Sequence, residues 1–187
     1  MDNGHDDLKR HTPALLLQEC ADFFCRNAPP GPILDLACGN GRNGIFLAKK
    51  GLPVILCDVS EEALADAGML AEKNGVAPLL WQVDLEKAEG SPLAVDEYAG
   101  MLVFSYLHRP LIPCIQKSLK KKGLLVYETF TVDQSRYGKP HNPAFLLKHG
   151  ELQSWFSDWE ILYYDEGIKP DPERAVAQIF CRKPESG

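Results

Sequence analysis

The sequence predicts a single α/β domain built on a doubly wound sheet of seven mostly parallel strands. Short apolar runs alternate with helix-like segments along almost the whole chain. This order is typical of a parallel sheet with helices on both faces. The last two strand-like runs are joined by about ten residues without a clear helical pattern, which predicts an antiparallel hairpin at one edge. A length of 187 residues fits one such domain.

Local signals set the predicted element boundaries. The pair Thr12-Pro13 offers an N-cap and a first helical residue, and the proline-rich segment 29–32 ends that helix. Ser60 can cap a later helix, which Asn74-Gly75 closes. The predicted strands span residues 33–36, 54–57, 79–83, 100–106, 124–130, 160–164 and 175–181. The predicted helices span residues 12–26, the segment from a glycine turn to about 50, 61–73, 110–122 and 151–156.

Composition and charge narrow the functional classes. The 26 acidic and 20 basic residues give a formal net charge of −6, which offers no general attraction to a phosphate backbone. The one basic run, Lys120–Lys122, falls at the end of a predicted helix, where cations favour the helix dipole. We therefore expect a small-molecule substrate rather than nucleic acid, acted on by a monomer or homodimer.

The chain also carries signs of its compartment. No apolar run approaches the ~20 residues that cross a bilayer, and the polar start MDNGHDDLKRH lacks the apolar core of a signal peptide. The six cysteines are scattered, without a C-x-x-C pair or a Cys/His cluster at zinc spacing. Free, mostly buried thiols suit a reducing compartment. We expect a cytoplasmic protein with no metal site and no membrane contact.

The most informative segment is the glycine-rich turn after the first predicted strand. The residues 33–44 read ILDLACGNGRNG, so that a strand runs into a turn that opens a helix. Glycines let the backbone approach a ligand and adopt positive φ, and the helix start behind them offers free amides. The pattern G-x-G-x-x-G is a weak signal alone. It also fits a turn without a ligand, or an NAD site.

Acidic residues mark the ends of three consecutive predicted strands. Asp35 lies at the first, Asp58 closes the second and Asp84 follows the third. Parallel strands bring these ends to one crevice, where a carboxylate can accept both ribose hydroxyls of a nucleoside. An NAD enzyme would place its pyrophosphate on the helix start, where Asp35 adds unhelpful negative charge. Three acids facing one crevice make coincidence unlikely, and Asp35 counts against a dinucleotide.

At this point the residues resemble the class I S-adenosylmethionine-dependent methyltransferases, which have a Rossmann-like fold. The resemblance implies that Gly39 and Gly41 pack against the methionine part of the cofactor, S-adenosylmethionine, and that Asp35 orders the loop. It assigns Asp58 to the ribose and Asp84 to the adenine amine. Ala37 departs from the glycine of many relatives. The expected cofactor-binding residues are Asp35, Ala37, Gly39, Gly41, Asn43, Asp58, Val59, Asp84, Leu85, Phe104 and Tyr106.

The candidate substrate side follows the fourth predicted strand. His108 is available for proton transfer and Arg109 for attracting an anion, although helix capping and surface polarity are the alternative roles. Tyr106 is expected to pack against the cofactor. The loop 131–147, which carries His141, is a candidate lid or collar over the crevice and equally an ordinary surface loop. We take His108, Arg109 and His141 as candidate catalytic residues. The aromatic group Trp155, Phe156, Trp159 and Tyr163 is expected to be core.

A closer resemblance is to the tellurite-resistance branch of these methyltransferases. It rests on the segments 35–43, 107–113 and 150–160 within roughly residues 30–165. It implies methyl transfer to a small soft or anionic acceptor, an oxyanion or a thiol-like compound. We divide the chain into a helical segment, 1–30, that packs on or caps the site, and a methyltransferase domain, 31–187. The rival hypotheses are an RNA or protein methyltransferase and a non-catalytic module that binds the cofactor.

Overall fold

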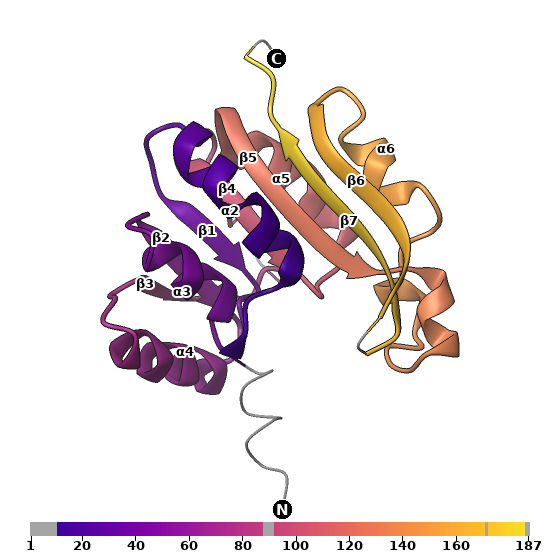
Figure 1. Ribbon diagram of the computed structural model, residues 1–187, viewed down its shortest axis with the longest axis horizontal. Coiled ribbons are helices and arrows are strands. Elements are labelled where there is room, and N and C mark those ends of the chain that lie inside the picture. The colour runs from indigo at the N-terminus through magenta and orange to yellow at the C-terminus, as the bar shows by residue number, and fades with distance from the viewer. Residues whose placement is uncertain (1–10, 88–91, 171, 186–187) are drawn as a thin grey trace, which may run out of the picture.

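The structure is a computed structural model that describes residues 11–87, 92–170 and 172–185. Its seven strands form one sheet in the order β3-β2-β1-β4-β5-β7-β6 (Figure 1). The strands are β1 (Ile33–Leu36), β2 (Val54–Asp58), β3 (Leu79–Gln82), β4 (Tyr98–Phe104), β5 (Leu119–Phe130), β6 (Glu160–Lys169) and β7 (Arg174–Arg182). The α-helices are α2 (Leu15–Asn27), α3 (Arg42–Ala48), α4 (Glu61–Lys73), α5 (Ile112–Ser118) and α6 (Glu151–Trp155).

The predicted architecture is confirmed. Strand β1 lies at the centre of a parallel set, with Ile33 opposite Val54 of β2 and Gly100 of β4. The chain reverses its direction of winding between β1 and β4, and this switch point opens a crevice at the carboxyl ends of the strands. Strand β7 runs antiparallel between β5 and β6, so that the final hairpin forms one edge of the sheet.

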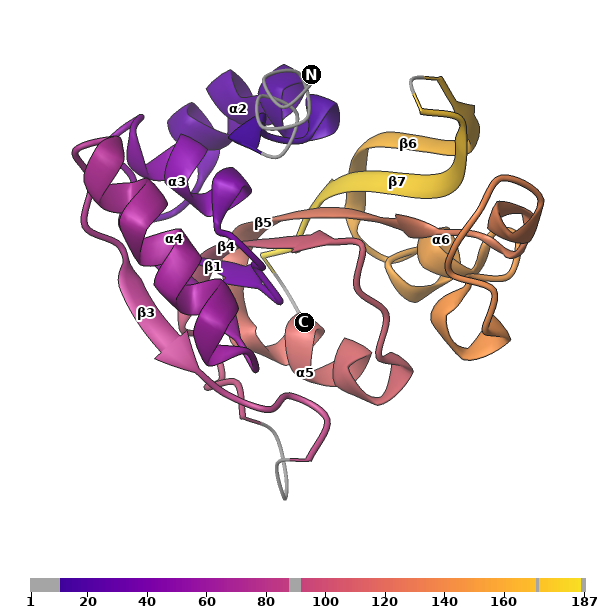
Figure 2. The ribbon, with the colours of Figure 1, turned by 90° about the horizontal axis from the view of Figure 1, so that it is seen from below.

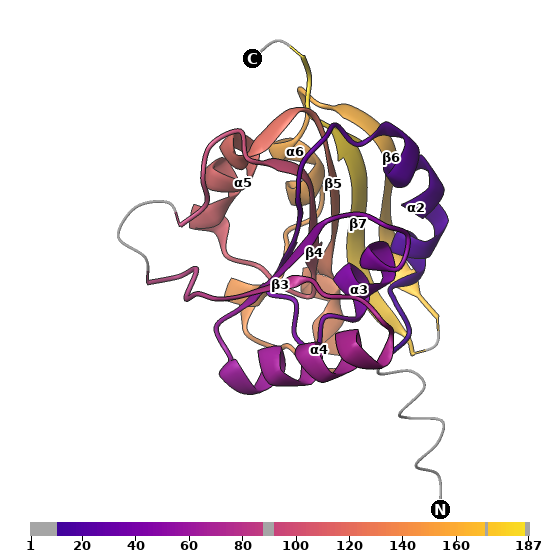
Figure 3. The ribbon, with the colours of Figure 1, turned by 90° about the vertical axis from the view of Figure 1, so that its left-hand side faces the viewer.

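Two apolar layers cover the two faces of the sheet. Figures 2 and 3 show α2 and α3 on one face and α5 on the other. Side chains alternate between these layers along β4: Met101 and Val103 pack with α5, whereas Leu102 and Phe104 pack with α2 and α3. This alternation is the ordinary pleat of a strand that is buried on both faces.

Several boundaries differ from the sequence prediction. The strand predicted over 100–106 is β4, Tyr98–Phe104, because Ser105 leaves the strand conformation with φ +55°. Helix α2 begins at Leu15 rather than at Thr12, because Ala14 is its N-cap residue and no side chain caps it. Helix α5 ends at Ser118, and the basic run 120–122 belongs to β5 rather than to a helix end. The buried Leu119 pairs with Tyr98, which starts the strand early. The strands of the last hairpin are longer than predicted, since β6 continues to Lys169 and β7 begins at Arg174.

Other sequence expectations concern side chains and segments. Tyr163 is 38% exposed rather than core, whereas Phe156 and Trp159 are buried and in edge-to-face contact. The described cysteines are free thiols. No helix of the described residues is long and apolar enough to cross a membrane. The capping role expected of segment 1–30 stays a prediction, because residues 1–10 lie outside the described part and α2 packs on the sheet.

Candidate functional site

A cleft of about 550 Å³ lies at the carboxyl ends of β1, β2 and β3. Its lining contains six of the predicted cofactor residues, which the fold brings together from four separate segments. The lining residues are Ala37, Asp58, Val59, Val83, Asp84, Leu85, Glu86, Lys87 and Tyr106. We call this the nucleoside cleft. Three of its nine residues are carboxylates, so it suits a cationic ligand.

The glycine turn is held beside this cleft by Asp58. Gly39 has φ +55° and Gly41 φ +73°, both in the left-handed region that glycine adopts readily. The Gly39 amide donates to Asp58 Oδ2 at 2.9 Å, and the Ser60 amide donates to Asp58 Oδ1 at 3.0 Å. Each carboxylate oxygen keeps a further lone pair. Asp58 therefore fixes the turn and remains able to accept hydrogen bonds from a ligand.

Asp35 and Asn43 hold the start of α3, next to the glycine turn, by hydrogen bonds, and they are not in the lining of the cleft. Asp35 is buried and accepts a hydrogen bond from the Gly44 amide at 2.8 Å. Burial raises the pKa of Asp35 to about 7, although the Gly44 hydrogen bond and Arg42 oppose the shift. Asn43 Oδ1 accepts from the Ala14 amide at 2.8 Å and so joins the start of α2 to α3.

Two residues with side chains adopt positive φ at the ends of neighbouring strands. Ala37 follows β1 with φ +53°, and Ser105 follows β4 with φ +55°. This conformation costs a residue with a Cβ atom about 1–2 kcal/mol and concentrates at functional sites. The glycine preference noted for position 37 thus has a backbone cause. At Ser105 the unusual φ ends the strand alternation, so Tyr106 turns to the cleft although Phe104 does not.

Asp84 is organised by the turn that follows β3. Its Oδ1 accepts from the amides of Glu86 and Lys87 at 3.0 and 3.2 Å. The Glu86 amide, followed by Lys87, lowers the pKa of Asp84, so the carboxylate is ionised at neutral pH. Leu85, the next residue, is buried in the cleft wall.

A second cleft of about 410 Å³ adjoins the first. Its lining residues are Glu86, Ser105, Tyr106, Leu107, Phe130, Lys139, Pro140 and Phe145. We call this the acceptor cleft. Glu86 and Tyr106 belong to both linings, so they mark the junction of the two clefts. Three of its lining residues come from the loop 131–147, which we call the collar.

The collar is anchored rather than loose. Thr131 forms a parallel bridge with Leu147, and the Leu147 amide donates to Phe130 O at 2.9 Å. Gln134 is buried, with Nε2 donating to Lys139 O at 3.1 Å and Oε1 accepting from the Ala175 amide at 2.8 Å. These bonds fix the backbone that carries the lining residues of the acceptor cleft.

The three candidate catalytic residues are not in either lining. His141 is an exposed collar residue next to Pro140. His108 Nδ1 lies 4.0 Å from Glu86 Oε2. Arg109 donates from Nε and Nη2 to both oxygens of Glu151, and from Nη1 and Nη2 to carbonyls of the collar. Its guanidinium is hydrogen-bonded to these partners and holds the collar, and its role in attracting an anion stays a prediction.

Sequence reasoning missed several lining residues. Glu86 and Ser105 lie beside predicted site residues, and only the turn geometry after β3 and β4 brings them to the junction. Lys139 and Phe145 lie in the predicted collar, but nothing in the spacing singles them out. Phe104, which was predicted to bind the cofactor, lies outside both linings and packs against the layer with α2 and α3, because it follows the pleat of β4; its contact with the cofactor stays a prediction.

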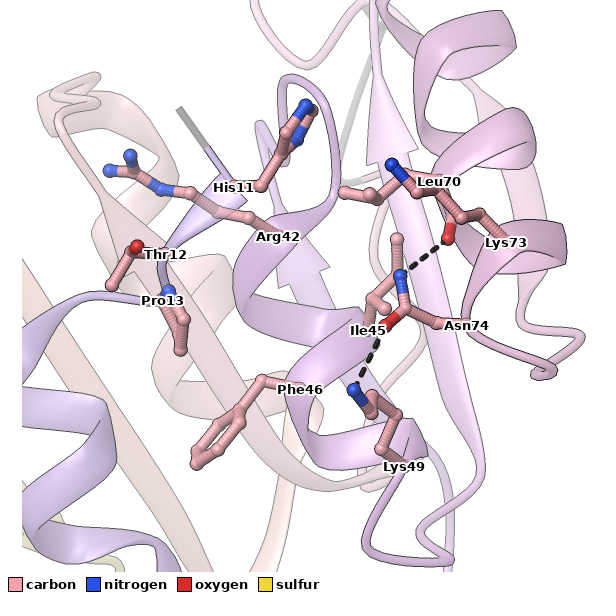
Figure 4. A pocket seen from close by; sticks show the side chains of 10 residues that line it. All are labelled: His11, Thr12, Pro13, Arg42, Ile45, Phe46, Lys49, Leu70, Lys73 and Asn74. Carbon is pink, nitrogen blue, oxygen red and sulfur yellow. Dashed lines mark hydrogen bonds between the residues drawn. The ribbon is translucent and has the colours of Figure 1, made fainter. Parts of the chain in front are cut away.

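A further hollow of about 530 Å³ lies between residues 11–13, α3 and α4 (Figure 4). Lys49 Nζ donates to Asn74 Oδ1 at 2.9 Å, and Asn74 Nδ2 donates to Leu70 O at 2.8 Å. The hollow shares no lining residue with the two clefts, and no predicted site residue lines it. We therefore place the candidate site at the two adjoining clefts.

The sheet order, the glycine turn after β1 and the carboxylates after β2 and β3 define the Rossmann-like fold of class I methyltransferases. The family model of tellurite resistance protein TehB matches residues 24–171, and the chain belongs to this family. A probable S-adenosyl-L-methionine-dependent methyltransferase TehB of Haemophilus influenzae is 27% identical over 146 residues, which are 74% of this chain and 49% of the relative. The chain thus spans about half the length of that curated relative.

Solved structures agree on the fold. The crystal structure of TehB from Haemophilus influenzae has a TM-score of 0.72 at 20% identity and is matched over 90% of this chain and 61% of its own. A SAM-dependent methyltransferase from Methanosarcina mazei has a TM-score of 0.65 at 18% identity, over 85% of this chain and 96% of its own. At these identities the likeness shows the fold alone.

Proposed function

We propose that this chain transfers the methyl group of S-adenosylmethionine to a small, soft acceptor, an oxyanion or a thiol-like compound. The observation that carries the proposal is the junction of two clefts at Tyr106 and Glu86. One cleft is lined by carboxylates and lies beside the glycine turn, an arrangement that suits a cationic nucleoside. The other is small and largely apolar. A group transfer between two ligands requires such neighbouring sites.

The nucleoside cleft fits the cofactor. Asp58 would accept the ribose hydroxyls, Asp84 the adenine amine, and the backbone of Gly39 and Gly41 would face the methionine part. An added Cβ at Gly39 would meet nothing within 4 Å, so the turn leaves open space beside its backbone. When bound, the cofactor supplies a methyl group on a sulfonium, which is already activated for displacement.

The residues of the acceptor cleft would orient the acceptor and exclude water. Phe130, Phe145 and Pro140 provide apolar walls, and Lys139 is the cationic residue in the lining. Alignment of two reactants can supply most of the rate enhancement of a displacement at an activated carbon. A soft anion needs no general base. Because Arg109 is committed to Glu151 and the collar, the attraction for an anionic acceptor rests on Lys139.

The test is a methyl-transfer screen with labelled cofactor against selenite, tellurite, hydrosulfide, small thiols, small amines, protein and RNA. We expect turnover with at least one soft inorganic or thiol acceptor, and a strong loss of turnover in Asp58→Ala. If the label appears in RNA or protein and in none of the small acceptors, the substrate is a macromolecule and the proposed substrate class is wrong. Cofactor binding without turnover on any acceptor would favour a non-catalytic module.

A further inference from the structure

The Tyr106 hydroxyl has an unexplained place in the structure. Among the described residues, it is the one buried side-chain oxygen or nitrogen without a hydrogen bond of ordinary geometry, although the Glu86 carboxylate lies close enough to act on its pKa as an acceptor. A buried polar atom without a partner is a cost to folding, and most proteins leave few of them. The atom belongs to a residue that lines both clefts. A polar atom at such a position points to a partner that arrives with a ligand.

The backbone of Tyr106 is fixed, whereas its hydroxyl is not. Tyr127 is buried and its hydroxyl donates to Tyr106 O at 3.0 Å. The preceding Ser105 has φ +55°, and its amide donates to Glu128 O at 2.9 Å. The fold therefore accepts backbone strain to bring this side chain to the junction. A tyrosine needed only for packing would serve equally well as phenylalanine.

The hydroxyl is a donor under physiological conditions. Burial raises the pKa of Tyr106 well above its usual value, and the Glu86 carboxylate adds to the shift by its charge and as a hydrogen-bond acceptor for the hydroxyl. The ionised phenolate is therefore disfavoured, and the O–H group remains intact at neutral pH. A donor of this kind suits a ligand that offers a hydrogen-bond acceptor, such as an oxygen atom.

We infer that Tyr106 is an acceptor-binding residue whose hydroxyl donates a hydrogen bond to an oxygen of an oxyanion held in the acceptor cleft. The inference rests on the proposed function and names the contact that would orient its substrate. With selenite, the selenium lone pair forms the new Se–C bond. The sulfonium C–S bond breaks and its electron pair stays on sulfur. No proton is transferred, so the tyrosine keeps its own.

A pair of matched substitutions tests the hydroxyl without any substrate. Tyr106→Phe removes a buried oxygen that has no partner, whereas Tyr127→Phe removes one that donates at 3.0 Å. In the unliganded chain, we expect Tyr106→Phe to raise Tm by about 2 °C or more and Tyr127→Phe to lower it by a similar amount. A lower Tm for Tyr106→Phe would show that the hydroxyl has a structural partner and would overturn the inference.

Kinetics with two acceptors test the contact itself. Selenite carries oxygens and hydrosulfide carries none, but both present a soft nucleophile. We expect Tyr106→Phe to reduce the ratio of kcat/KM for selenite over hydrosulfide by about tenfold or more, the worth of a hydrogen bond to a charged group. An unchanged ratio would overturn the inference. If the wild-type chain methylates no soft inorganic or thiol acceptor of the screen although it binds the cofactor, the proposed acceptor class fails, while the two Tm measurements still decide whether the hydroxyl awaits a ligand.

Discussion

The guanidinium of Arg109 and the carboxylate of Glu151 form a two-point hydrogen-bonded ion pair across the acceptor side of the fold. Nε lies 2.7 Å from Oε1 and Nη2 lies 2.8 Å from Oε2. The same guanidinium donates to Ala144 O at 2.9 Å and to Leu146 O at 2.8 Å. One side chain between β4 and α5 therefore joins α6 to the collar, and the acceptor cleft depends on that connection.

We expect Arg109→Ala to lower the free energy of unfolding by about 1–3 kcal/mol, because it leaves a charged acceptor and two carbonyls without their donor. Arg109→Lys should not restore the loss, since an ammonium cannot make the two-point contact. Acceptor KM should rise while cofactor affinity stays within about twofold. Urea unfolding and calorimetry measure both effects.

A double-mutant cycle with Glu151→Gln provides the control for this pair. The two losses should be less than additive by about 0.5 kcal/mol or more if the side chains act through one another. Strict additivity would mean that each supports the collar separately. If cofactor affinity falls together with acceptor affinity, Arg109 acts on the nucleoside cleft, although it is not one of the residues that line it.

Asp35 should give the chain a pH-dependent stability. Its pKa is raised by burial from an ordinary value of 3.8 to about 7 in the folded chain. Between these values the folded chain holds a proton that the unfolded chain has lost. The free energy of unfolding should therefore fall as pH rises from about 4 to about 7, by up to about 1.4 kcal/mol per pH unit, and then level off.

The substitution Asp35→Asn should remove that slope, because the amide oxygen can still accept from Gly44 and does not ionise. Asp66→Asn is the matched control, since Asp66 is an exposed residue of α4. Denaturant unfolding at several pH values from 4.5 to 8.5 measures the slopes. Wild-type and Asp35→Asn curves that run parallel would show that Asp35 ionises normally in the folded chain.

The sequence predicts the nucleoside cleft better than the acceptor cleft for a physical reason. Asp58 and Asp84 follow consecutive parallel strands, and parallel strands bring their ends to one edge whatever the details of packing. The acceptor cleft depends on side chains that meet across long stretches of chain. Arg109 and Glu151 are 42 residues apart, and no local pattern indicates that the arginine is already paired.

Backbone conformation limits prediction in the same way. Phe104 and Tyr106 are two residues apart, and a regular strand would place both on one face. The positive φ of Ser105 breaks that rule, so Phe104 packs against the layer with α2 and α3 whereas Tyr106 lines the clefts. Serine adopts this conformation only when the surrounding structure imposes it. The strand pattern alone therefore could not separate the two aromatic residues.

Asp58→Ala should weaken binding of S-adenosylmethionine and of its demethylated product by roughly 1–3 kcal/mol, because hydrogen bonds to a charged acceptor are lost. Part of the loss would come from the turn, since Asp58 also accepts from the amides of Gly39 and Ser60. Asp58→Asn, which keeps one acceptor oxygen, should give a smaller loss. Calorimetry decides the matter, and an affinity equal to wild type in both variants would mean that the ribose lies elsewhere.

Gly44 and Gly68 form a matched pair of helical glycines with opposite expectations. An added Cβ at Gly44 would lie 2.4 Å from Leu56 Cδ2 and 3.0 Å from Asp35 Oδ2, because α3 packs closely on β1 and β2. An added Cβ at Gly68 would meet only Leu80 Cδ1, at an ordinary 3.4 Å. Gly44→Ala should therefore cost about 1–3 kcal/mol through overpacking, whereas Gly68→Ala should stabilise α4 by about 0.5–1 kcal/mol.

Gly44→Ala should also weaken cofactor binding, because the Gly44 amide holds Asp35 at 2.8 Å and the helix start would shift away from the turn. Gly68→Ala should leave binding unchanged. Urea unfolding and calorimetry on both variants supply the comparison. Equal stabilities for the two variants would show that α3 and the sheet can shift enough to accommodate an added Cβ at Gly44. Gly44 would then matter for the position of the glycine turn and not for the packing of α3.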